Sequence, residues 1–204
     1  MADCGTANPM TARPAEPQAV LDFWFGPEGS VAHGSQRKEW FAKDDAFDAS
    51  IAERFGATVE QALRGELDAW ADEPRSALAR ILLLDQFTRN AFRGTPRAFA
   101  GDPQALAAAS TMVGARQDEQ LPAFMRAFVY LPFEHAESMA MQDEAVRLFT
   151  RMAAADPAFA SMLDYAHRHR AVIERFGRFP HRNLVLGRVS TAEEIEFLAQ
   201  GSSF

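Results

Sequence analysis

Five polar side chains interrupt the most apolar stretch of the chain, and their types could bind or pair with charged groups. They are Asp85, Gln86, Arg89, Asn90 and Arg93. The last four are spaced i, i+3, i+4 and i+7, so on a helix they share one face, which continues the apolar stripe of Leu78 and Leu82. An interior hydrogen-bonding group without a partner costs roughly 1–3 kcal/mol, and a charge costs more. These side chains therefore need partners, either within the protein, with Asp85 paired to Arg89 in a structural network, or in a bound ligand.

A second group of such residues lies in the segment LPFEHAES, residues 131–138. Pro132 predicts the start of a helix containing residues 133–152, which places Glu134 on a core-facing stripe. The other members of that stripe are Ser138, Met141, Ala145, Leu148 and Met152. Glu134 is therefore expected to be buried or to line a cavity, with His135 and Glu137 on either side. Acid–base chemistry by Glu134 or His135 is one interpretation, and a structural role for Glu134 at a helix N-terminus is the other.

The third group is a basic segment between residues 168 and 188, which holds six arginines and one glutamate and so has a local formal charge of +5. Its candidate site residues are His169, Arg178, His181, Arg182 and Asn183. Arginine presents a planar fork of donors that suits carboxylate or phosphate, so the segment predicts a small anionic ligand or a peptide carboxylate. The alternative is that these arginines pair internally with Asp85, Glu134 and Glu137.

Motifs for metals, nucleotides and covalent catalysis are absent from the sequence. There is no H-E-x-x-H, no cysteine pair, no EF-hand loop, no glycine-rich phosphate loop and no G-x-S-x-G. His167 and His169 are two residues apart, so on a helix they point in different directions and cannot bind one ion together. We therefore expect no metal and no cofactor.

Composition and charge exclude several classes of partner. The chain has 204 residues, a formal charge of -7 and a single cysteine, Cys4. An acidic balance argues against nucleic-acid or anionic-membrane binding, since both depend on many basic contacts. The densest aliphatic run, residues 81–84, is far shorter than the roughly 20 apolar residues of a membrane-spanning helix. A lone cysteine and the lack of a signal-peptide pattern in the opening residues favour the cytoplasm.

The elements that must position these residues are helices. Apolar residues recur every three or four positions and strand-like alternation is nearly absent, so we predict an all-α fold. Eight or nine helices in antiparallel hairpins are expected, in a tetratricopeptide-like superhelical bundle. Residues 1–15 are expected to form a disordered tail and residues 16–204 one α-helical domain.

Prolines, glycines and capping residues predict where these helices begin and end. Pro17 opens the first, Asp44 caps the second, and Thr191 with Glu194 forms a capping box for the last. Residues 40–41 mark a short helix, and one long helix should run from Pro74 to about residue 92. Further helices are expected at 96–101, 102–115, from Pro122, from Pro132 and at 157–177, followed by a loop over 178–189.

Four phrases resemble a bacterial family known as domain of unknown function 924. They are VLDFWFG (20–26), ILLLDQFTRNAFRGTPRAF (81–99), YLPFEHAE (130–137) and HRAVIERFGRFPHRNLVLGRVSTAEE (169–194). The resemblance implies an all-α, tetratricopeptide-like fold and no established activity. It also implies that recurrent polar positions of the family fall on the candidate residues above, together with Arg188. Ala136 departs from the serine of the family pattern, and His167 matches no family position.

Three functions are compatible with these observations. The first is a cytoplasmic helical binding module with a polar, arginine-containing pocket for a small anion or a peptide carboxylate. The second is a hydrolase or transferase in which Glu134 or His135 is the acid or base, while Arg89 and Arg182 stabilise negative charge. The third is a protein-interaction scaffold whose polar cluster only stabilises the fold.

Overall fold

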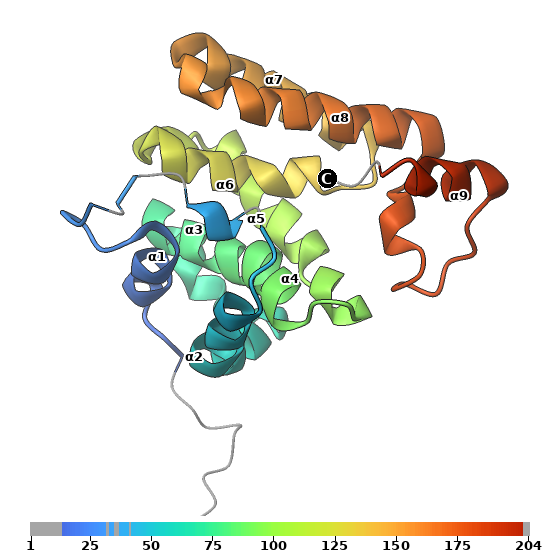
Figure 1. The fold of residues 1–204 in the computed structure, drawn as a ribbon. Coiled ribbons are helices and arrows are strands. Elements are labelled where there is room, and N and C mark those ends of the chain that lie inside the picture. Colours follow the sequence, from blue (N-terminus) through green and yellow to red (C-terminus); the bar gives the residue numbers. More distant parts are fainter. Residues whose placement is uncertain (1–13, 32, 35–36, 41, 202–204) are drawn as a thin grey trace, which may run out of the picture.

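The secondary structure of the chain is helical throughout the part that the structure describes, as predicted (Figure 1). This computed structural model describes residues 14–31, 33–34, 37–40 and 42–201. The α-helices are α1 (Pro17–Phe25), α2 (Asp45–Leu63), α3 (Pro74–Leu82), α4 (Thr88–Ala91), α5 (Asp102–Gly114), α6 (Ala123–Glu134), α7 (Met139–Ala155), α8 (Ala160–Phe176) and α9 (Ala192–Ala199). The short helical turns are η2 (Lys38–Trp40), η3 (Asp68–Asp72), η4 (Leu83–Phe87), η5 (Pro96–Phe99), η6 (Asp118–Gln120), η7 (Pro157–Phe159) and η8 (Pro180–Arg182).

Most helix ends lie where capping residues, prolines and glycines predict them. Asp44 accepts hydrogen bonds from the backbone N–H groups of Ala46 and Phe47, and Thr191 with Glu194 forms the predicted capping box at α9. Helix α8 ends at Gly177, whose φ of 68° is left-handed and therefore favours glycine. Of the tail expected over residues 1–15, residues 1–13, which include Cys4, lie outside the described residues, as does the Phe41 end of the short helix. The backbone N–H of Ala15 donates to the Thr58 hydroxyl at 3.0 Å.

The helices pack around one large apolar core. Trp24, Phe25, Phe87 and Phe128 are almost completely buried in it and meet one another largely edge to face. Helices α1 to α5 form one side of the molecule, α6 crosses it, and α7 and α8 lie side by side as a further layer over α6 (Figure 1). This arrangement brings residues of α4, α6 and α8 around one space.

The predicted long helix from Pro74 to about residue 92 contains a wider turn in its middle. Helix α3 runs into η4, which is π-helical, and η4 runs into α4. A π-turn places one more residue in the turn than an α-helix and leaves carbonyls that need other donors. The Thr88 hydroxyl donates to the carbonyl oxygen of Leu84 at 2.8 Å, so this carbonyl is satisfied. Asp85 and Gln86 lie in this turn.

The prediction that Pro132 opens a helix is wrong. Pro132 lies in the last turn of α6, and the next helix starts at Met139, after Ser138. Proline removes one backbone donor, but continuing the helix buries both Pro132 and Phe133, which favours the continuous helix. The side-chain amide of Gln142 donates to the carbonyls of Glu134 (2.7 Å) and Ala136 (2.8 Å) and so caps α6. Glu134 therefore ends α6 and does not begin the following helix.

No helix in the described part of the chain combines the length and the apolar character that crossing a membrane requires.

Candidate functional site

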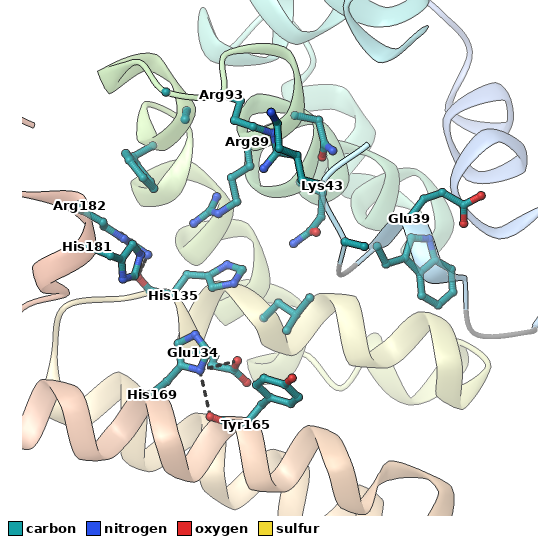
Figure 2. Close-up of a pocket in the computed structure, with 18 of the residues that line it drawn as sticks. Glu39, Lys43, Arg89, Arg93, Glu134, His135, Tyr165, His169, His181 and Arg182 are labelled. Atoms are coloured by element: carbon teal, nitrogen blue, oxygen red, sulfur yellow. Dashed lines mark hydrogen bonds and ion pairs between the residues drawn. The ribbon is translucent and has the colours of Figure 1, made fainter. Parts of the chain in front are cut away.

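A cavity of about 400 Å³ lies where η2, η4, α4, α6, α8 and η8 meet (Figure 2). Nine of the residues singled out from the sequence line it, and they come from segments far apart in the chain. They are Gln86, Arg89, Asn90, Arg93, Glu134, His135, His169, His181 and Arg182. The polar side chains of the three sequence groups thus converge on one space.

Asp85 lies directly behind this lining and orients His135. Its side chain is only 1% exposed, and its Oδ1 lies 2.7 Å from Nδ1 of His135 and 2.9 Å from Nη1 of Arg89. The amide of Gln86 donates to Oδ2 at 2.6 Å. Burial acts to raise the pKa of Asp85, but Arg89 and His135 outweigh it and hold the pKa well below its usual range. Asp85 is therefore a carboxylate that can only accept, so Nδ1 of His135 carries the hydrogen.

Arg89 and Arg182 share the carboxylate of Asp102. Arg89 donates to both oxygens of Asp102, at 2.8 and 3.1 Å, and Arg182 donates to Oδ2 at 3.2 Å and to the backbone carbonyl of His135 at 3.0 Å. The Arg182 guanidinium also lies over the rings of Phe99 and Phe179. Burial, together with the nearby charge of Arg89, lowers the pKa of Arg182 to about 10, so it remains cationic at neutral pH.

Glu134 is uncharged at neutral pH. It is 3% exposed, and burial, with the Asp85 carboxylate nearby, raises its pKa to about 8. One oxygen, Oε1, lies 3.1 Å from Nδ1 of His169, which also lies 2.9 Å from the carbonyl of Tyr165 (Figure 2). The other oxygen, Oε2, is buried and has no hydrogen-bond partner within the described structure. A carboxyl group at the carbonyl end of a helix is also better neutral than charged.

The three histidines of the cavity are neutral. Burial lowers the pKa of His135, an effect that Arg89 adds to and Asp85 opposes. Burial and the neighbouring His135 lower the pKa of His169 to about 3, and burial with Arg182 lowers that of His181 to about 4. At neutral pH these rings therefore offer one donor and one acceptor nitrogen each.

Three of the four cations of the wall have their counter-ions behind them, and the fourth, Lys43, pairs with the exposed Asp45 at 2.9 Å. Lys43, Arg89, Arg93 and Arg182 line the cavity, whereas Asp48, Asp85 and Asp102 do not. Asp48 accepts from Arg93 at 2.5 and 3.0 Å and from Asn90 at 2.7 Å. Of the carboxyl groups in the lining, Glu134 is neutral and Glu39 lies 3.8 Å from Arg37. The surface that faces the cavity is therefore cationic even though the local charges nearly balance.

Three of the predicted site residues lie outside the cavity lining. They hold the C-terminal segment, residues 178–190, in place. Arg178 donates to both oxygens of Glu194, and Asn183 donates to Glu194 and to Ser190. Glu137 accepts from the Arg188 guanidinium at 2.6 and 2.9 Å and from the backbone N–H of Phe179. These contacts fix the loop that carries His181 and Arg182.

The basic segment as a whole does not face the cavity. Of its six arginines only Arg182 belongs to the lining, and the other five pair with acidic side chains. These pairs are Arg168–Asp164, Arg170–Asp143, Arg175–Glu193, Arg178–Glu194 and Arg188–Glu137. Internal pairing is confirmed for these five arginines, but the predicted partners are wrong for four of them, since only Arg188 pairs with one of the three that were named, Glu137.

Sequence reasoning missed several residues of the site. The missed lining residues include Glu39, Trp40, Lys43, Phe99, Leu131, Met162 and Tyr165. Asp102 was interpreted only as the start of a helix, yet it is the shared partner of Arg89 and Arg182. A usable signal was the neighbouring Gly101, because a glycine at a helix start can mark a close backbone approach.

No group of three or more metal-binding side chains occurs among the residues that the structure describes.

A family model for "Bacterial protein of unknown function (DUF924)" matches residues 20–202. The chain belongs to the DUF924 family. This DUF924 chain is also similar to a solved structure, described as a protein of unknown function, ATU0120, from Agrobacterium tumefaciens. The sequences are 39% identical, the match covers 91% of this chain and 97% of that one, and the TM-score is 0.79. No curated protein matches. These comparisons establish the family and the helical fold, and they support no specific function for the protein.

Proposed function

We propose that this DUF924 protein binds a small anionic organic molecule in the cavity. The observation that carries the proposal is the wall itself, in which Arg89, Arg93 and Arg182 face the cavity while the aspartates that balance them lie behind. An anion that enters meets N–H groups first, and the aspartates hold those groups in place.

Arg182 supplies the deepest donor for such a ligand. Its Nε is buried and has no hydrogen-bond partner in the described structure, while its other two nitrogens are engaged by Asp102 and His135. A buried donor without a partner costs free energy, which a ligand oxygen would recover on binding. We therefore place the carboxylate or phosphate of the ligand at Arg89 and Arg182.

The remaining wall suits the carbon part of the ligand. Phe99, Leu131 and Met162 give apolar surface, and a volume of about 400 Å³ lies within the usual range of small-molecule sites. We propose a ligand with one anionic group and a short apolar body, and no nucleic-acid or membrane partner.

Two expectations, one about the cellular compartment and one about the stacking of the helices, remain part of the proposal. Cys4 is the single cysteine of the sequence, which favours a reducing compartment such as the cytoplasm. The consecutive packing of α6, α7 and α8 favours a tetratricopeptide-like stacking of helical hairpins.

Thermal denaturation with added anions tests the proposal. Inorganic phosphate, succinate and benzoate probe different anionic groups and apolar bodies. A ligand at 100 times its dissociation constant should stabilise the protein by roughly 2.7 kcal/mol. If none of the three raises the melting temperature, the proposal is wrong.

The two lysines of the chain provide a matched pair of variants. Lys43 lines the cavity with its side chain 63% exposed, whereas Lys38 is exposed and lies outside the lining. We expect Lys43→Gln to weaken anion binding about two- to fivefold, since an exposed charge contributes up to about 1 kcal/mol. Lys38→Gln should leave the affinity unchanged. Equal weakening by both variants would indicate a general charge effect and would contradict a site at the cavity.

A further inference from the structure

His135 has the arrangement of a general base. Its Nδ1–H donates to Asp85 at 2.7 Å, which leaves the lone pair on Nε2, and the ring lines the cavity (Figure 2). Asp85 is in turn fixed by Arg89 and by the amide of Gln86. A buried carboxylate on Nδ1 holds the tautomer and stabilises the imidazolium that forms when Nε2 takes a proton.

Glu134, the next residue along α6, is suited to give a proton. It lines the same cavity, and its buried Oε2 has no hydrogen-bond partner in the described structure. Its environment keeps it protonated at neutral pH, as the raised pKa of about 8 indicates. A base and an acid with opposite protonation states therefore border one space.

The lining lacks the hydroxyl and thiol side chains that usually form acyl-enzyme intermediates. Among the described residues around the cavity there is no serine, threonine or cysteine. This composition favours direct attack by water and disfavours a covalent acyl-enzyme intermediate.

We propose that the cavity hydrolyses an ester bond of a small anionic molecule, with His135 as general base and Glu134 as general acid. This inference rests on the proposed binding of such a molecule and adds a reaction to it.

The reaction is balanced by proton transfers through His135 and Glu134 and by the release of one proton to solvent. Nε2 of His135 takes a proton from water as the water oxygen bonds to the ester carbonyl carbon. The bond from that carbon to the alcohol oxygen then breaks, and the Glu134 carboxyl proton passes to the alcohol. The imidazolium proton restores Glu134, and the acid product leaves as its anion with its proton released to solvent. The free carboxylate of the substrate stays at Arg89 and Arg182, where the anionic group of the ligand is placed, and the other two cations of the wall, Lys43 and Arg93, stabilise the negative charge on the carbonyl oxygen.

Two esters of succinate separate the base from the acid. The 4-nitrophenyl monoester has a good leaving group that needs little proton donation, whereas the monoethyl ester needs it. His135→Gln should slow both by about 10² to 10⁴-fold, and Glu134→Gln should slow the ethyl ester far more than the nitrophenyl ester. His167→Gln makes the same change at an exposed histidine outside the cavity and should leave both rates unchanged.

The pH profile of ethyl ester hydrolysis gives a readout that a structural role would not produce. The rate should fall above about pH 8 as Glu134 loses its proton, and this fall should be absent in Glu134→Gln. The titratable groups that face Glu134 are Asp85 and His169. Those that face His135 are Asp85, Arg89, Asp102, His169, His181 and Arg182.

The experiments distinguish a failure of the binding proposal from a failure of the hydrolysis proposal. If succinate stabilises the protein but wild type and His135→Gln hydrolyse both esters equally, the hydrolysis proposal is overturned and the binding proposal stands. If succinate does not bind, both proposals fail for this class of ligand. Should circular dichroism show that His135→Gln is unfolded, the selective loss of ethyl ester hydrolysis in Glu134→Gln decides the question, and equal loss on both esters counts against the acid role.

Discussion

At the scale of single residues, the cavity is unusual in holding buried ionisable groups in their neutral forms. Glu134 stays protonated and His169 stays unprotonated at neutral pH, in both cases mainly because of burial. Neither group gains the stability that a buried ion pair with full hydrogen bonding would give. Burying the two groups therefore lowers the free energy of unfolding. Such costs are common where a protein binds or transforms a ligand.

The raised pKa of Glu134 predicts how the free energy of unfolding depends on pH. The folded-state pKa is about 8 and the usual value is 4.5, so between these values the folded protein keeps a proton that the unfolded chain releases. The free energy of unfolding should therefore fall as pH rises from about 4.5 through about 8. In Glu134→Gln this decline should be reduced, and the variant should be more stable than wild type at about pH 9.

Urea denaturation at several pH values measures this dependence. Glu196→Gln makes the same change at an exposed position and should leave the pH dependence as in wild type. If Glu134→Gln retains the full decline, Glu134 is ionised in the folded protein and is not a proton donor.

At the scale of elements, the π-turn η4 and the start of α5 are fitted to each other. A Cβ atom on Gly101 would lie 2.1 Å from the carbonyl oxygen of Leu84, so only glycine allows the two backbones to approach this closely. The approach brings Asp102, at the start of α5, to the guanidinium of Arg89. One glycine thus sets the distance between the turn that carries Asp85 and the carboxylate that holds both arginines.

Gly101→Ala should therefore destabilise the fold by roughly 1–3 kcal/mol, because a backbone atom must move to admit the methyl group. Gly56→Ala is the matched control. Gly56 lies inside α2 with nothing near its Cβ position, so alanine should stabilise the fold by about 0.5–1 kcal/mol. Urea denaturation of the two variants measures both effects, and a loss of stability no larger at Gly101 than at Gly56 would contradict the close approach.

The sequence predicts elements and burial better than it predicts partners. Helix caps such as Asp44 and Thr191 act within a few residues, so local pattern was enough to place them. The polar face from Gln86 to Arg93 was predicted by its spacing, and it does reach the cavity. Asp102 was not predicted, because its partner Arg182 is 80 residues away and only the packed fold brings them together. Pro132 was misplaced because packing in α6 outweighed one lost hydrogen bond.

At the scale of the whole molecule, the C-terminal segment has its own small core. Val172, Ile173 and Phe179 form a cluster separate from the main one. The loop over residues 178–190 is held to the rest of the protein by polar contacts, among them the ion pair of Glu137 with Arg188, and Met139 of α7 packs against the small core. It nevertheless contributes His181 and Arg182 to the cavity. The site is therefore closed on one side by a part of the chain that a few hydrogen bonds keep in position.

Glu137→Gln should loosen this segment without unfolding the protein. It weakens the pairing with Arg188 and the contact to the Phe179 backbone, so amide hydrogen exchange should become faster over residues 178–190 and stay unchanged in α1 to α5. Glu174→Gln removes a more exposed pairing, with Arg170, and should leave exchange over 178–190 as in wild type. Uniform acceleration across the whole chain would show that the segment does not open independently.

The wide turn at Leu83–Phe87 also restricts how the length of this chain can vary. Because a π-turn holds one residue more than an α-helical turn, removing one residue from it would restore ordinary α-helical spacing and leave the flanking residues nearly in their present orientation. Removing one residue from α3 instead would rotate everything that follows by about 100° around the helix axis. Arg89, Asn90 and Arg93 should therefore keep facing the cavity after a one-codon deletion in the turn, whereas a one-codon deletion in α3 should abolish ligand binding.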